Sequence, residues 1–156
     1  MNILVINGPN TNMFGVAQTK IFGNITLGDI ENKIKEAALG SAKVSFFQSN
    51  HEGAIIDRIH RAYDESIDYI IINAGAYAHT SIAIRDAFLA TNIPFIEVHM
   101  SNIYAREDFR NKSYLSDIAL GVITGFGDNS YILALAHLLS IEKEIIIKYI
   151  TEFENV

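Results

Sequence analysis

The chain has 156 residues, of which 49% are apolar and 19% charged, so its length is typical of one domain and its composition excludes a disordered tail and a coiled coil. The sequence contains no uninterrupted apolar run near ~20 residues, which excludes a conventional membrane-spanning helix. A net charge of −6 argues against broad binding to nucleic acid or to an anionic membrane.

The sequence contains no cysteine, so we expect no disulfide, no thiolate metal ligand and no cysteine nucleophile. The first residues, MNILVINGPN, carry no basic segment and reach Gly8-Pro9 after a short apolar run. This pattern is not that of a secretory signal peptide. Both observations favour a cytoplasmic location.

Strand and helix candidates alternate along the chain. Asn2–Asn7 is a short apolar run ended by Gly8-Pro9, which is typical of a buried strand. Thr26 and Asp29 then resemble a capping box that opens a helix to about Leu39. Further strands are predicted at Val44–Gln48, Asp68–Asn73, Pro94–Val98 and Ala119–Thr124, and further helices at Glu52–Tyr63, Ser81–Ala90 and Ser130–Phe153. The last helix is predicted from an apolar stripe formed by Tyr131, Leu135, Leu138, Leu139, Ile145, Ile146, Tyr149 and Ile150.

This alternation predicts βαβ crossovers and therefore a parallel sheet. The strand candidates are continuously apolar rather than alternating, which indicates that both faces of the sheet are covered by helices. We therefore expect one domain over residues 1–156, an α/β three-layer sandwich around a flavodoxin-like, doubly wound, five-stranded parallel sheet. Residues 8–25 and 99–117 show no regular pattern, and loops of that length are usually functional.

Polar side chains follow four of the predicted strands, where the carboxyl ends of parallel strands meet at one edge of the sheet. They are Asn7, Asn10 and Asn12; Ser49, Asn50, His51 and Glu52; Asn73, Tyr77, His79, Thr80 and Ser81; and Glu97, His99, Ser101 and Asn102. Ligands of open α/β sheets bind outside this edge, near the switch in strand order. The sequence therefore predicts a small-molecule site there.

Glu97 and His99 are two residues apart on a predicted strand, so their side chains share one side of it. A carboxylate beside an imidazole can fix the tautomer of the ring, as a general acid requires, but a purely structural pair would look the same in the sequence. His79, taken alone, is better explained as a core histidine or as a neighbour of a helix N-cap than as a site residue.

Other chemistries find no support in the sequence. The first strand is not followed by G-x-G-x-x-G or by a phosphate-binding loop, and no G-x-S-x-G element occurs. His79, Asp86, Glu97 and His99 form no recognised metal-ligand spacing. We expect neither a metal nor a cofactor.

Five stretches together resemble the type II 3-dehydroquinate dehydratases of the shikimate and quinate pathways. They are ILVINGPNTN at 3–12, FFQSNHEGAIID at 46–57, IIINAGAYAHTSIAIRD at 70–86, PFIEVHMSNIYAREDFRNKSYLS at 94–116 and GVITGFG at 121–127. The resemblance implies a flavodoxin-like fold, a homo-oligomer that is usually a dodecamer built from trimers, and no cofactor or metal.

The same resemblance implies conversion of 3-dehydroquinate to 3-dehydroshikimate by trans elimination of water through an enolate. His99 matches the general acid, Asn10 the residue that stabilises the enolate oxygen with a water, and Glu97 the carboxylate that orients the histidine. Substrate-binding positions are matched by Asn73, His79, Asp86 and Arg110, and by Met100 and Ser101, whose backbone amides hold the substrate carboxylate in the family.

The first loop departs from the family pattern. Ala17 stands at the position of a lid arginine, and Phe22 at that of the tyrosine base that removes the C2 proton. Since phenylalanine has no ionisable group, we expect a hydro-lyase of impaired activity.

Three interpretations of this loop remain open. Lys20 could serve as the base if burial lowered its pKa, although a solvated loop lysine is the simpler interpretation. Alternatively the chain is a non-catalytic homologue that binds a cyclic polyol carboxylate, or an engineered, inactivated enzyme. Arg106, Arg110 and Lys112 supply local positive charge for such a ligand.

Overall fold

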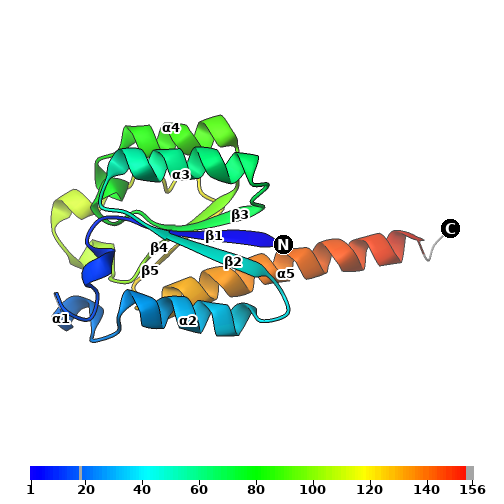
Figure 1. Ribbon diagram of the computed structural model, residues 1–156, viewed down its shortest axis with the longest axis horizontal. Coiled ribbons are helices and arrows are strands. Elements are labelled where there is room, and N and C mark those ends of the chain that lie inside the picture. The colour runs from blue at the N-terminus through cyan, green and yellow to red at the C-terminus, as the bar shows by residue number, and fades with distance from the viewer. Residues whose placement is uncertain (18, 154–156) are drawn as a thin grey trace.

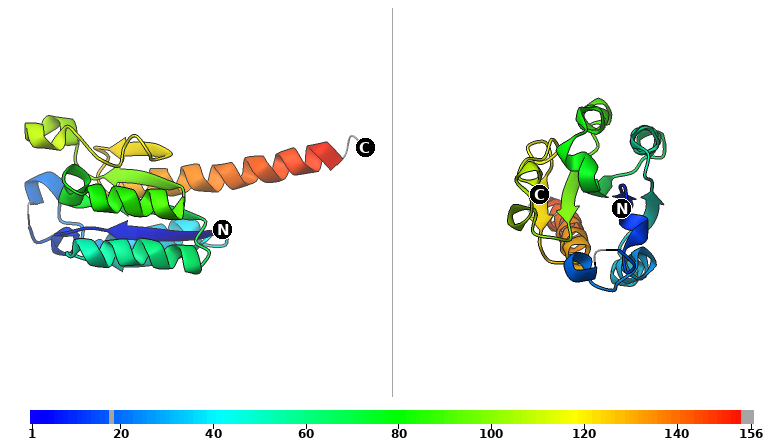
Figure 2. Two further views of the ribbon diagram at one scale, coloured as in Figure 1. Left: turned by 90° about the horizontal axis from the view of Figure 1, so that it is seen from above. Right: turned by 90° about the vertical axis from the view of Figure 1, so that its left-hand side faces the viewer.

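A computed structural model of the chain describes residues 1–17 and 19–153, apart from the side chains of Thr19, Glu142 and residues 145–153. Its centre is a five-stranded sheet in the order β2-β1-β3-β4-β5 in which every neighbouring pair is parallel. Helices cover both faces of this sheet (Figure 1; Figure 2, right). The predicted flavodoxin-like three-layer sandwich is confirmed.

The elements follow the predicted order, with ends within a few residues of the expected positions. The strands are β1 (Asn2–Asn7), β2 (Lys43–Gln48), β3 (Tyr69–Asn73), β4 (Phe95–His99) and β5 (Gly121–Thr124), and the helices are α1 (Thr19–Phe22), α2 (Leu27–Ala38), α3 (Glu52–Asp64), α4 (Ile82–Thr91) and α5 (Asn129–Phe153). The capping box of α2 is confirmed, because Thr26 Oγ1 accepts from the Asp29 N–H at 3.1 Å and Asp29 Oδ2 accepts from the Thr26 N–H at 3.0 Å.

The two segments expected to lack regular structure contain short helices. Helix α1 and a 3₁₀ turn at Thr11–Met13 lie in the first segment, and 3₁₀ turns at Ile103–Ala105 and Asp108–Arg110 lie in the second. Each is at most one turn long. A single turn is too short to produce a 3.6-residue apolar repeat, so hydrophobic periodicity could not predict it.

Both faces of the sheet are apolar because successive strand residues enter different layers. In β1, Leu4 and Ile6 pack with the core beneath α3 and α4, whereas Ile3 and Val5 pack with the core beneath α2 and α5. All four are fully buried. The continuous apolar runs in the sequence are therefore the mark of a sheet covered on two sides.

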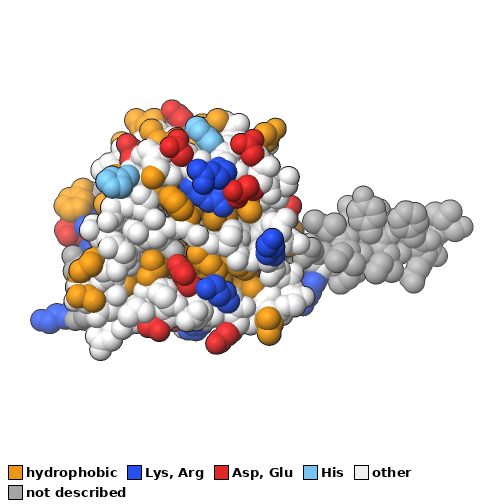
Figure 3. Space-filling view, in the orientation of Figure 1, with side chains coloured by type: hydrophobic (Ala, Val, Ile, Leu, Met, Phe, Trp, Pro, Cys, Tyr) orange, Lys and Arg blue, Asp and Glu red, His pale blue; other side chains and the backbone are white. Residues whose placement is uncertain are grey.

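Helix α5 begins under the sheet and runs well past its end (Figure 2, left). Tyr131, Leu135 and Leu138 from its predicted apolar stripe are buried, and the part of that stripe over 145–150 lies outside the described side chains. Within the described part of the chain, no helix combines the length and the apolar character needed to cross a membrane. Acidic and basic side chains are interspersed over the described part of the face in Figure 3.

Strands β1 and β3 are neighbours at the point where the strand order reverses, and Asn7 at the end of β1 is in register with Asn73 at the end of β3. The chains leaving these strands pass very close together. A Cβ on Gly8 would lie 2.3 Å from the carbonyl oxygen of Ala74, so only glycine fits there. This crossing forms the base of the loop that carries Asn10.

Candidate active site

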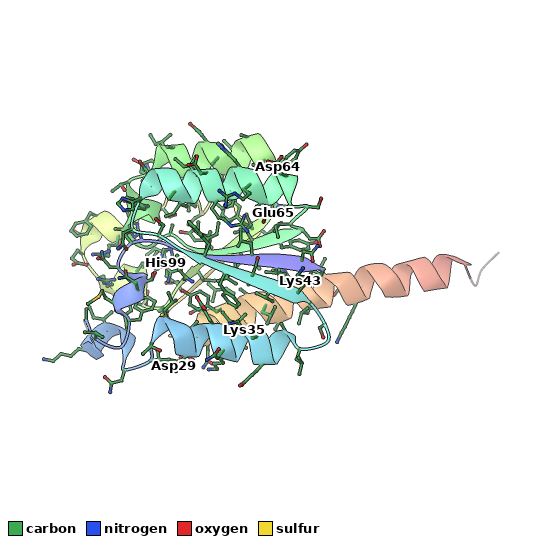
Figure 4. All side chains as sticks on the ribbon, viewed as in Figure 1. Asp29, Lys35, Lys43, Asp64, Glu65 and His99 are labelled. Atoms are coloured by element: carbon green, nitrogen blue, oxygen red, sulfur yellow. The ribbon has the colours of Figure 1, made fainter. Side chains whose placement is uncertain are left out.

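A cavity of about 360 Å³ opens at the carboxyl ends of β1, β3 and β4. It lies where doubly wound sheets bind ligands, beside the switch in strand order. Its lining comes from the loop after β1, from α1, and from the segments that follow β3 and β4: Pro9, Asn10, Thr11, Met13, Phe14, Ala17, Phe22, Asn73, Gly75, Ala76, His79, His99, Met100, Ser101, Ile103, Arg106 and Arg110. Figure 4 places His99 toward this edge of the sheet.

Glu97 and His99 form the pair that their spacing predicted. Their side chains lie on one side of β4, with Glu97 Oε1 2.7 Å from His99 Nε2. Glu97 is fully buried, while His99 is 5% exposed and lines the cavity. The carboxylate therefore lies behind the imidazole and acts on a ligand only through it.

Glu97 remains an acceptor despite its burial. Burial alone would raise the pKa of Glu97, but hydrogen bonds from His99, Ser113 and Ser116 outweigh it and hold that pKa below the ordinary value. The ionised carboxylate can only accept, so His99 Nε2 carries a proton. His99 Nδ1 is thus the ring atom left to exchange a proton with a ligand.

His79 has the complementary arrangement. Its Nδ1 lies 2.8 Å from the backbone oxygen of Lys112, which can only accept, so Nδ1 carries the proton. Burial, opposed by that hydrogen bond and helped by the nearby His99, lowers the pKa of His79, which keeps the ring neutral. The two rings are stacked with centroids 5.9 Å apart. His79 Nε2 is therefore an acceptor for a ligand hydroxyl.

The loop that carries Asn10 is held by contacts with the segment after β2. Asn10 has a left-handed backbone, φ 66°, and its N–H donates to Asn50 Oδ1 at 2.9 Å. Tyr77 fixes Asn50 in turn, because its hydroxyl donates to the Asn50 carbonyl oxygen at 2.8 Å. Three strand ends are joined in this way, and the Asn10 side chain lines the cavity.

The cavity carries positive charge although the chain as a whole is acidic. Arg106 and Arg110 both line it, and Glu107 Oε2 accepts from Arg110 Nε at 2.8 Å. Burial and the neighbouring charge of Arg110 lower the pKa of Arg106, with Glu107 opposing the shift. Two guanidinium groups with one acidic neighbour therefore favour an anionic ligand. Lys112 lies outside this lining.

The two residues of the first loop that differ from the family pattern lie in the cavity wall. Both Ala17 and Phe22 line the cavity. The Phe22 ring lies 5.1 Å from that of Phe14, and the Arg106 guanidinium lies 5.7 Å from the Phe22 ring centroid. Lys20 is exposed and lies outside the lining. The wall beside Arg106 is therefore apolar.

The structure brings together most of the residues singled out from the sequence. The lining includes Asn10, Ala17, Phe22, Asn73, His79, His99, Met100, Ser101 and Arg110. Glu97 lies behind His99, and Asp86 is exposed on α4, outside the cavity. Among the described side chains, no group of three or more His, Cys, Asp or Glu residues is placed to hold a metal ion.

Sequence reasoning missed the residues that support the site from behind. Ser113 Oγ donates to Glu97 Oε1 at 2.6 Å and Ser116 Oγ donates to Oε2. Tyr131 was expected only as part of an apolar stripe, yet its hydroxyl contacts Asn7 and Asn73. A tyrosine in an otherwise aliphatic buried stripe was the available signal, since a buried phenol needs a partner.

The fold and the cavity define a class of protein: a flavodoxin-like α/β protein whose cavity at the switch point is lined by two arginines and by a histidine held by a buried carboxylate. Within that class, the chain belongs to the class II dehydroquinase family, whose model, Dehydroquinase class II, matches residues 1–139. The family resemblance in the sequence is thereby confirmed.

Individual relatives agree with this assignment. The chain is 57% identical over 134 residues to the 3-dehydroquinate dehydratase of Methylococcus capsulatus, covering 85% of this chain and 90% of the relative. It is also 57% identical over 141 residues to that of Francisella philomiragia, covering 90% and 95%. The crystal structure of the type II dehydroquinase from Butyrivibrio crossotus superposes with a TM-score of 0.86 at 46% identity, covering 90% of this chain and 97% of that one.

Proposed function

We propose that this chain is a hydro-lyase that converts 3-dehydroquinate to 3-dehydroshikimate and water with much reduced turnover. The observation that carries the proposal is one cavity lined by His99, which Glu97 holds from behind, and by Phe22. His99 and Glu97 supply the acid half of a trans elimination. Phe22 cannot act as the base, because its side chain has no ionisable group.

The binding half of the site matches a polyhydroxylated cyclic carboxylate. Arg106 and Arg110 favour the carboxylate, and the backbone amides of Met100 and Ser101 are the proposed donors to it. His79 Nε2 accepts from a ligand hydroxyl. The cavity volume of about 360 Å³ suits a single small ring.

The acid half follows from the state of His99. In the proposed slow elimination solvent water takes the proton from C2 in place of a side-chain base, an enolate forms, and the departing hydroxyl leaves as water with a proton from His99 Nδ1. Asn10, which also lines the cavity, stabilises the enolate oxygen with a water. Glu97 keeps Nε2 protonated and the ring in place throughout.

The missing base is the reason for reduced turnover. The loss of a positioned base costs ~10²–10⁴ in rate. The same feature favours a second function, in which the chain binds the cyclic polyol carboxylate and never turns it over. An exposed Lys20 outside the lining supports the solvated-lysine interpretation rather than a substitute base.

We expect 3-dehydroquinate to bind saturably in titration calorimetry and the enone absorbance of the product to rise slowly. His99→Gln should abolish that rise, and His60→Gln, at an exposed position of α3, should leave it unchanged. The absence of saturable binding would refute the proposal. A kcat in the ordinary enzyme range of about 1–10³ s⁻¹ would refute the impairment. Binding without any turnover would establish the non-catalytic alternative.

We also propose a homo-oligomer, which the family resemblance implies to be a dodecamer built from trimers. Ile82 and Leu89 of α4 are 57% and 55% exposed, and their spacing places them on one helix face with Asp86. An interface over this face would cover the apolar side chains and bury Asp86 beside a second copy. Sedimentation equilibrium should give a multiple of three chains; a monomer at micromolar concentration would contradict the proposal.

A further inference from the structure

A buried tyrosine hydroxyl joins the ends of the two strands that flank the switch point. Tyr131 of α5 is fully buried. Its hydroxyl donates to Asn7 Oδ1 at 2.6 Å and accepts from Asn73 Nδ2 at 2.8 Å. Burial raises the pKa of Tyr131, so the hydroxyl keeps its proton and acts as both donor and acceptor. One oxygen atom therefore couples β1 to β3 at their carboxyl ends.

This hydroxyl and the Gly75 N–H together hold the orientation of the Asn73 amide. Asn73 Oδ1 accepts from the Gly75 N–H at 3.2 Å, and one Nδ2 hydrogen is given to Tyr131. A reversed amide would place Nδ2 against the Gly75 N–H, donor against donor. Since Asn73 also lines the cavity, its second Nδ2 hydrogen is the group left to offer to a ligand.

Asn7 has a less favourable environment than Asn73. Asn7 Nδ2 is buried and has no hydrogen-bond partner among the described residues, although Asn7 Oδ1 accepts the tyrosine proton. An unpaired buried donor is costly. The role of the Asn7 side chain therefore rests on its oxygen. Asn7 Oδ1 accepts the Tyr131 hydroxyl proton, so the Tyr131 oxygen can only accept from Asn73.

We propose that Tyr131 is a positioning residue. Its hydroxyl donates to Asn7 and accepts from Asn73, and it thereby holds the Asn73 amide so that the amide offers an N–H donor to an oxygen of the ligand ring. The inference rests on the proposed function, because it assumes that Asn73 contacts the ligand. Tyr131 itself lies outside the cavity lining.

The test is a double-mutant cycle on the dissociation constant of 3-dehydroquinate, measured by titration calorimetry. Tyr131→Phe removes one oxygen, and we expect it to raise the dissociation constant about 3- to 10-fold. In the Asn73→Ala background the same substitution should change it less than about 2-fold. Where turnover is measurable, KM should rise more than kcat falls. Tyr63→Phe, at an exposed position of α3, is the matched control and should change nothing.

An equal effect of Tyr131→Phe in both backgrounds would show a merely structural role and overturn the inference, as would no effect in either. If Tyr131→Phe fails to fold, Asn7→Leu replaces it. With its acceptor gone, the hydroxyl is no longer held as an acceptor for Asn73 Nδ2, so the amide keeps only its Gly75 contact and binding should weaken in the same way. Unchanged binding would overturn the inference. Unaltered binding by Asn73→Ala alone would instead show that the proposed site is wrong.

Discussion

Ala17→Arg combined with Phe22→Tyr should raise the rate of 3-dehydroquinate dehydration by ~10²–10⁴, the typical contribution of a positioned base. Both residues line the cavity, so the new side chains would stand at its wall. The Arg106 guanidinium lies 5.7 Å from the Phe22 ring centroid. A cation at that distance stabilises a phenolate, so the added tyrosine would have a lowered pKa and act as a base near neutral pH.

The single variants separate the two contributions. Phe22→Tyr alone should recover part of the rate, whereas Ala17→Arg alone should recover little, because the base would still be missing. Lys20→Met is the matched control: Lys20 is exposed and outside the lining, so its removal should leave the parent rate unchanged. Initial rates of enone formation measure all four proteins. No gain in the double variant would mean that this loop is aligned wrongly with the family.

Glu97→Ala should lower the free energy of unfolding at pH 7 by about 3–5 kcal/mol, the usual cost of breaking a buried, hydrogen-bonded charge pair. Glu97 is fully buried and accepts from His99, Ser113 and Ser116. Its removal leaves three donors without their acceptor, one on the buried His99 and two on the half-buried Ser113 and Ser116, and opens a small cavity. Urea denaturation measures the loss. Glu36→Ala on α2 is the exposed control and should change stability by about 0.5 kcal/mol or less.

The pH dependence of the same pair has a definite sign. Hydrogen bonds outweigh burial and lower the pKa of Glu97 in the folded chain below the ordinary value of 4.5. A lowered carboxyl pKa stabilises the fold above the unfolded pKa, and the stabilisation is lost as pH falls through the folded pKa. The stability difference between the parent and Glu97→Gln should therefore be largest at neutral pH and shrink below about pH 4.5. A difference that grows on acidification would contradict this.

The parallel-sheet architecture could be predicted from the sequence because short apolar runs, helical stripes and helix caps are local patterns. Continuous apolar runs such as Asn2–Asn7, separated by helical stripes and by caps such as Thr26 with Asp29, leave few topologies open other than a covered parallel sheet. The motifs also led to the family, and most of the candidate site residues predicted from them line one cavity. The one-turn helices of the loops escaped prediction because a single turn carries no periodicity.

The sequence by itself determined the composition of the site: an acidic chain with local arginines, a histidine two residues from a glutamate, and a first loop with Ala17 and Phe22 in place of ionisable residues. Only the tertiary structure decided how these groups act. The donors on Glu97 come from Ser113 and Ser116, and the contact that orients Asn73 comes from Tyr131, 58 positions away along the chain. Asp86 lies outside the cavity because of the side of α4 on which it falls. Hydrogen-bond direction and burial depend on contacts between distant segments, and no local pattern records them.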